Sequence, residues 1–94
     1  MIHVLVRLQV EDYNQFKSAF EDALGWRRER GEKSFDLYRR EHDSNDLTIL
    51  FGWDEIGVAR DVFASTEWRR RMDDAGVVGE PRVTFLQLLD RGQA

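Results

Sequence analysis

The sequence lacks cysteine, contains only one proline and two histidines, and has no long apolar run among its 94 residues. Without cysteine there can be no disulfide, no thiolate nucleophile and no Cys-ligated zinc or iron–sulfur site. His3 and His42 lie in different segments and form no zinc-binding pattern. No segment approaches the roughly 18 apolar residues of a membrane span, and the residues from Met1 to Arg7 lack a signal-peptide pattern. We therefore expect a cytoplasmic protein with no metal ion and no membrane partner.

Positive charge is also in short supply. The chain has 14 lysines and arginines against 18 aspartates and glutamates, a net charge of −4. It lacks the broad basic surface that binding to a phosphate backbone requires, so no nucleic-acid partner is expected. Its 41% hydrophobic, 12% aromatic and 34% charged residues are typical of a globular protein. The length predicts one domain over residues 1–90, followed by a loose tail at 91–94.

The first third of the chain predicts a strand followed by a helix. Residues 2–10 alternate so that one face is entirely apolar, which is typical of a strand. Asp12 is suited to cap a helix, and Gln15 three residues later completes a capping-box pattern. We expect this helix to end near Arg30. Residues at spacings of three and four predict its core-facing stripe: Tyr13, Phe16, Phe20, Ala23, Leu24 and Arg27.

The middle of the chain predicts a hairpin. Residues 33–41 and 47–53 have β-type patterns, and the polar residues 42–46 between them favour a turn.

A second helix and a last strand complete the pattern. Asp54 is expected to cap the helix, which should be split or kinked near Ser65 and end before Gly76. Residues 79–81, Gly-Glu-Pro, are expected to break the chain before a strand at 83–89.

The order β-α-β-β-α-β predicts an α+β, ferredoxin-like fold, with one four-stranded antiparallel sheet and both helices on one face. The second face carries more apolar surface than a solvated face of this size normally presents. We therefore expect a homodimer in which two such faces pack on each other. The expected interface residues are Leu5, Leu50, Leu86 and Leu88.

Three stretches carry a resemblance to a known family: residues 47–54, 63–68 and 72–81. With them the chain resembles the antibiotic-biosynthesis-monooxygenase-like members of the dimeric α+β barrel superfamily. The resemblance implies that two sheets form a barrel with the helices outside, and that a small-molecule pocket lies between sheet and helices. Members include cofactor-independent monooxygenases of aromatic polyketides and quinones, haem-degrading enzymes, isomerases and proteins without known activity. RNA-recognition modules share the topology, but their basic, glycine-rich aromatic motif is missing here.

The haem-degrading branch of that superfamily uses an asparagine on the first strand and a tryptophan and a histidine on the second helix. The corresponding positions here are Val6, Val62 or Phe63, and Met72 or Asp73. None matches, so we expect neither haem nor another cofactor.

The expected pocket is mostly apolar and would hold a small apolar or aromatic molecule. For Trp53 core packing is the favoured interpretation, and for Met72 it is a core or dimer contact. The predicted lining residues are Val6, Phe16, Phe20, Leu37, Trp53, Phe63 and Met72.

Catalysis has only weak candidates: His3 and Tyr38 for proton transfer, and Arg7 and Arg40 for holding an anion. Structural roles, or intersubunit ion pairs of the arginines with Asp36 or Glu41, are the simpler interpretations. The sequence therefore favours a homodimer with a small-molecule pocket and unassigned activity. The alternative is a cofactor-independent monooxygenase acting on a phenolic, quinone or polyketide-like substrate.

Overall fold

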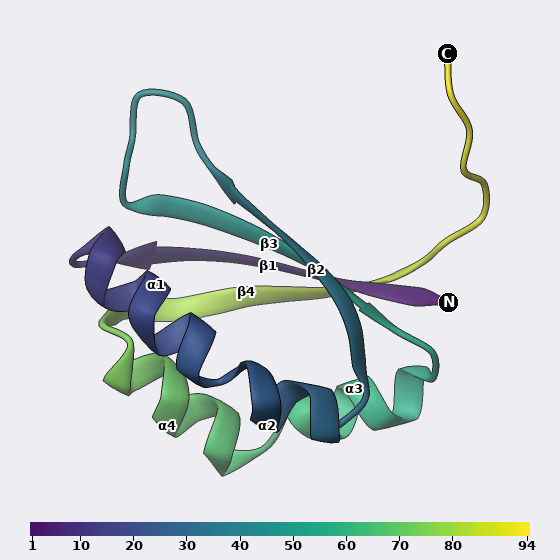
Figure 1. Ribbon diagram of the computed structural model, residues 1–94, viewed down its shortest axis with the longest axis horizontal. Helices are drawn as coiled ribbons and strands as arrows, with labels where there is room; N and C mark the ends of the chain where they lie inside the picture. Colours follow the sequence, from purple (N-terminus) through teal and green to yellow (C-terminus); the bar gives the residue numbers. More distant parts are fainter.

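The computed structural model describes residues 1–94 and has a four-stranded antiparallel sheet with its helices on one face (Figure 1). The strands are β1 (Ile2–Val10), β2 (Glu32–Arg39), β3 (Asp46–Trp53) and β4 (Val77–Gln87). The helices are α1 (Tyr13–Asp22), α2 (Leu24–Glu29), α3 (Ile56–Phe63) and α4 (Thr66–Asp74). The strand order is β2-β3-β1-β4, so the predicted ferredoxin-like α+β fold is confirmed. No helix is long and apolar enough to cross a membrane.

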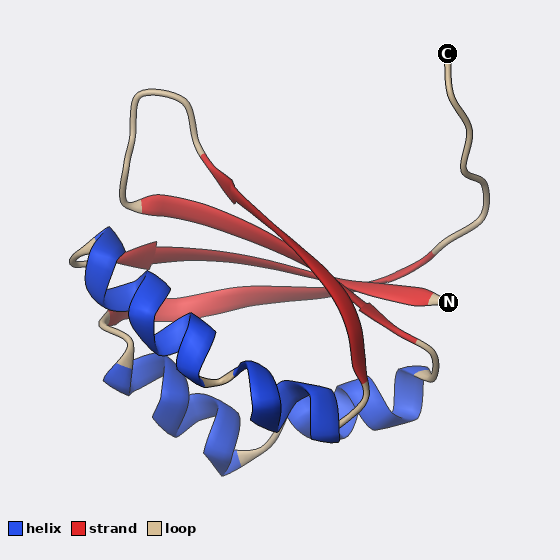
Figure 2. Ribbon diagram, viewed as in Figure 1, coloured by secondary structure: helices blue, strands red, loops and turns tan.

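Side-chain alternation along the strands decides which residues enter the core. On β1, Val4 and Val6 are fully buried beneath the helices, and the registers place Phe51 and Ile49 of β3 beside them. The residues between them in sequence point to the other face, where no helix lies (Figure 2). We call this second face, made by His3, Leu5, Arg7 and Gln9 of β1 with their neighbours in register on β2, β3 and β4, the open face.

The first predicted helix is divided in two. Asp12 caps α1 as expected, accepting a 3.0 Å hydrogen bond from the backbone N–H of Gln15. Gln15 does not complete a capping box, because its side chain instead donates to the carbonyl oxygen of Asp74. The prediction of one continuous helix to Arg30 was wrong, since α1 ends at Asp22 and α2 follows at an angle (Figure 1).

The second helical region shows the predicted split. The Ser65 hydroxyl caps α4, accepting a 3.1 Å bond from the N–H of Trp68. The expectation that Asp54 caps α3 was wrong: the capping position belongs to Glu55, whose side chain makes no capping bond.

The last strand starts earlier than the sequence indicated. β4 begins at Val77, and residues 79–81 form an irregular stretch inside it where a break before a strand at 83–89 was expected. The pairing with β1 shifts here, from Arg7 opposite Arg82 to Gln9 opposite Val78. Gly79 has φ +73°, a left-handed conformation that glycine adopts without strain. The extra residues make a bulge, which is tolerated because β4 is an edge strand.

Candidate functional site

A groove of about 290 Å³ lies between α4 and β4, on the helix side of the sheet. Its residues come from α3, from α4 and from both sides of the bulge in β4. They are Phe63, Trp68, Arg69, Met72, Asp73, Val77, Gly79, Glu80, Pro81 and Val83. The volume is near the lower end of the range for small-molecule sites, roughly 300–1,000 Å³.

The bulge builds one wall of this groove. Residues 79–81 bow out of the ladder because three residues of β4 stand where β1 offers only Leu8 between its paired positions. Proline is accepted at Pro81 because an edge strand does not need every N–H for the ladder. The bulge therefore keeps β4 away from α4 at this point and leaves room for a ligand.

Aromatic side chains form the opposite wall. The rings of Phe63 and Trp68 meet edge to face, with centroids 4.5 Å apart. Phe63 also packs on Phe51, at 5.5 Å, and on Trp53, at 5.4 Å, so the wall is fixed to the central core. Trp53 uses its indole N–H within the core, donating to the carbonyl oxygen of Arg30 at 2.9 Å. Trp68 itself is buried, only 6% exposed, and lines the groove from α4.

The polar groups of the groove are Arg69 and Asp73 on α4 and Glu80 on the bulge, all exposed. The lining contains no histidine, tyrosine, serine or threonine. It can bind and orient a molecule through its aromatic walls and these charges, and its only proton acceptors are the two carboxylates.

The structure separates the seven residues predicted to line a pocket. Phe63 and Met72 line the groove. Val6, Phe16, Phe20 and Trp53 are buried in the packed core. Leu37 packs against that core from β2. A single cavity shared by all seven does not exist, because the aromatic rings fill the space between helices and sheet.

The space between α1, α2 and α4 confirms how full the core is. Phe16, Phe20, Trp68 and Met72 border a gap of only about 10 Å³ there. Such a gap holds at most about one water molecule.

The four catalytic candidates do not converge, and none lines the groove. His3 lies on the open face, with its Nδ1 3.0 Å from the carbonyl oxygen of Phe51. Arg7 and Tyr38 are also on that face, in the row that contains Thr48 of β3. Arg40 lies in the hairpin, where its Nη1 is 3.4 Å from Oδ2 of Asp46 in the same chain. The sheet therefore separates three of the four candidates from the groove.

A buried ion pair is the main feature that the sequence did not reveal. Nε of Arg27 lies 2.5 Å from Oε1 of Glu32, and the two side chains are only 3% and 2% exposed. The guanidinium also donates to the carbonyl oxygen of Phe20 at 2.8 Å and lies 3.9 Å from the centre of its ring. Its Nη2 has no partner. The signal available in the sequence was Arg27 itself, a charged residue within the predicted core-facing stripe of the first helix.

Burial controls the ionisation of this pair. Desolvation lowers the pKa of Arg27 and raises the pKa of Glu32, and for each group this outweighs the opposing attraction of its partner. The pair lies at the end of α2 and the start of β2, so it joins helix layer and sheet but does not reach the groove.

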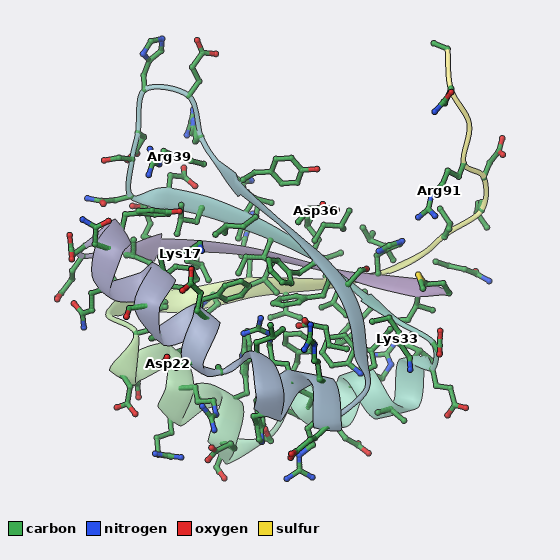
Figure 3. All side chains as sticks on the ribbon, in the orientation of Figure 1. Lys17, Asp22, Lys33, Asp36, Arg39 and Arg91 are labelled. Carbon is green, nitrogen blue, oxygen red and sulfur yellow. The ribbon has the colours of Figure 1, made fainter.

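The open face holds three of the four leucines predicted to form an interface. Leu5 lies beside Leu50 in the register, Leu86 lies opposite His3, and Leu86 is 39% exposed. Leu88 falls after the end of β4, and its backbone N–H donates to the carbonyl oxygen of Met1. Figure 3 shows the labelled Asp36 on the side of the sheet away from the helices, in the row of Leu50 and Leu5.

A second hollow opens on this face. It is lined by Arg7, Gln9, Asp46, Glu80 and Arg82, among others, and has a volume of about 310 Å³. No group of three or more His, Cys, Asp or Glu side chains is placed to hold a metal ion.

Comparison with known proteins identifies the fold. No family model matches the sequence, and no curated protein sequence matches it significantly. Among solved structures, the chain is similar to a Bordetella bronchiseptica protein classed with the antibiotic biosynthesis monooxygenases. The two share a TM-score of 0.78 and 17% identity, over 94% of this chain and 96% of the other.

Two further structures agree with this result. SnoaB, a cofactor-independent oxygenase from Streptomyces nogalater, has a TM-score of 0.78 at 13% identity, over 96% of this chain and 94% of its own. A Nitrosomonas europaea protein of the same class has a TM-score of 0.73 at 16% identity, over 96% of this chain and 100% of its own. The chain therefore has the fold of the antibiotic biosynthesis monooxygenases.

Proposed function

We propose that the protein is a homodimer that binds a small aromatic molecule in the groove between α4 and β4. The observation that carries the proposal is the groove itself, whose wall contains the edge-to-face rings of Phe63 and Trp68. Aromatic walls favour a planar apolar ligand. The charges of Arg69, Asp73 and Glu80 at the edge of the groove would orient its polar end.

The homodimer follows from the open face. Leu5, Leu50 and Leu86 expose apolar surface on a face that no helix covers. A chain of 94 residues also has a small core, so covering this face would add substantially to its stability. Light scattering at micromolar concentration is expected to give the mass of a dimer, and a monomer alone would contradict this part of the proposal.

A second function is a cofactor-independent monooxygenase, favoured by the similarity of fold to SnoaB. In this reaction the substrate loses a proton and itself supplies the electrons to oxygen, and the protein stabilises the resulting anion. We rank it second because His3, Arg7, Tyr38 and Arg40 all lie outside the groove.

A panel of hydroquinones and anthrone-like phenols separates the two functions. Thermal shift reports binding, and an oxygen electrode reports protein-dependent oxygen uptake. Val83→Trp fills the groove, whereas Val58→Trp makes the same change at an exposed position of α3 and serves as the control. Circular dichroism first establishes that both variants fold.

Stabilisation by a panel member in the wild type and in Val58→Trp, but not in Val83→Trp, supports binding in the groove. Oxygen uptake with the same pattern would reverse our ranking in favour of the oxygenase. Equal stabilisation of all three proteins would place the ligand elsewhere, and no stabilisation of any of them would contradict an aromatic-binding role.

A further inference from the structure

The open face carries two unpaired arginines on one side and an unpaired aspartate at its other edge. Arg7 of β1 and Arg82 of β4 lie directly opposite each other in the register. Asp36 lies on β2, at the other edge of the sheet, and all three side chains belong to exposed residues. None of the three forms an ion pair within the chain.

This arrangement is unfavourable for an isolated subunit. Like charges directly opposite each other on neighbouring strands destabilise a sheet. The nearest acids do not relieve them, since Asp46 pairs with Arg40 and Glu80 lines the same hollow without forming an ion pair. When a second copy covers the neighbouring leucines, the two arginines lose their hydration. The free-energy cost of this desolvation is offset only if the second copy places carboxylates next to them.

The strand order decides how a second copy can supply those carboxylates. Because β4 and β2 are opposite edges of the sheet, a two-fold axis parallel to the strands lays β4 of one subunit over β2 of the other. Arg82 of each subunit then lies over β2 of the other subunit, the strand that carries Asp36. A two-fold axis perpendicular to the strands instead lays β4 over β4 and keeps Asp36 away from the arginines.

The register makes contact feasible in the parallel arrangement. Arg82, Arg7, Thr48 and Tyr38 form one row across the sheet. Asp36 is the next open-face position along β2, roughly 7 Å from the position of Tyr38. A long arginine side chain that faces Tyr38 of the partner subunit can therefore reach Asp36 of the partner subunit.

We propose that Arg82, supported by Arg7, forms an ion pair with Asp36 of the partner subunit, and that this pair fixes the dimer axis parallel to the strands. The proposal rests on the homodimer proposed above and adds its geometry. Two-fold symmetry repeats the pair, so each interface contains it twice.

A charge-swap series tests the pair by sedimentation equilibrium. Asp36→Arg places three arginines together across the interface and is expected to raise the dimer dissociation constant at least about tenfold. Arg82→Asp is also expected to weaken the dimer, because two carboxylates then face each other. The combined variant Asp36→Arg/Arg82→Asp restores opposite charges and is expected to recover most of the wild-type affinity.

Matched controls make the same charge changes away from the open face. Asp22→Arg alters the exposed end of α1, Arg30→Asp alters the exposed end of α2 on the helix side of the sheet, and neither is expected to change the dissociation constant. Circular dichroism confirms the fold of every variant, and Asp36→Asn gives a milder test at the same position.

The outcomes separate this proposal from the homodimer itself. A monomeric wild type contradicts the homodimer. A dimeric wild type whose affinity is unchanged by Asp36→Arg, or is not recovered in the combined variant, contradicts the ion pair and leaves the homodimer standing.

Discussion

Removing the positive partner of the buried ion pair should make the stability of the protein depend steeply on pH. In Arg27→Met, Glu32 keeps its buried position but loses the charge and the hydrogen bond that lower its pKa. Desolvation, already the largest influence on the pKa of Glu32, then acts unopposed by Arg27 and raises that pKa further. The carboxyl group must be protonated or remain an unpaired charge.

The direction of the pH effect follows from this raised pKa. A group whose pKa is higher in the folded than in the unfolded state favours folding below the unfolded pKa. This contribution is lost as the pH rises through the folded pKa. The Arg27→Met variant should therefore be most stable near or below pH 4.5, the ordinary value for Glu32, and lose stability towards neutral pH.

The magnitude at neutral pH comes from the burial of the pair. Both side chains are almost completely enclosed, so breaking the pair leaves an uncompensated charge, at a cost of about 3–5 kcal/mol. A domain of 94 residues has a total stability of roughly 5–14 kcal/mol. The loss should lower the melting temperature by at least about 12 °C, since each kcal/mol shifts a domain of this size by about 4–8 °C.

Urea denaturation from pH 4 to pH 8 at one fixed protein concentration measures the effect, with the wild type over the same range supplying the contribution of all other groups and of dimerisation. The double variant Arg27→Met/Glu32→Leu is the control, because it removes both charges and fills the site with apolar groups. It should recover most of the stability at pH 7 and lose the additional pH dependence. A single variant with the pH profile of the wild type, or a double variant no more stable than the single one, would refute this reasoning.

Two further predictions concern the surface. Leu86→Arg would bury an unpaired positive charge in the proposed interface, at the position opposite His3, so size-exclusion chromatography with light scattering should show a monomer. Hydrogen bonding from Arg70, aided by the charges of Arg70 and Arg71, lowers the pKa of Glu67. Its stabilising effect is present above pH 4.5 and is lost as the pH falls through the lowered pKa. In denaturation between pH 2.5 and 6, Glu67→Gln should therefore lose less stability on acidification than the wild type, and equal losses would contradict this assignment.

Local signals predicted the fold because each had one physical interpretation. Alternation along residues 2–10 required one buried face, and that face is Val4, Val6, Leu8 and Val10. Ser65 was recognisable as a cap because its hydroxyl can reach the N–H of Trp68 three residues later. Such features depend on neighbours in the sequence and need no knowledge of the tertiary structure.

Features that depend on distant residues were not predictable in the same way. Helix α1 ends at Asp22, and the nearby Gly25 weakens a helix without ending it, so the sequence did not show that the chain turns there and brings Arg27 into the core. The bulge that forms one wall of the groove was not predicted, because Gly79 and Pro81 suggested a break in the chain. They mark a bulge, and whether such residues end a strand or bend it depends on the partner strand.

Strand alternation also separates the proposed ligand groove from the proposed dimer interface. On β1, Val6 points towards the helices, whereas Leu5 and Arg7 point to the open face. Substitutions at adjacent positions of this strand therefore change different surfaces of the sheet. The bulge is the exception. Glu80 lines both the groove and the hollow beside Arg82, because the irregular backbone places it at the edge between the two faces. Glu80 is therefore the position at which a single substitution alters both the groove and the hollow on the open face.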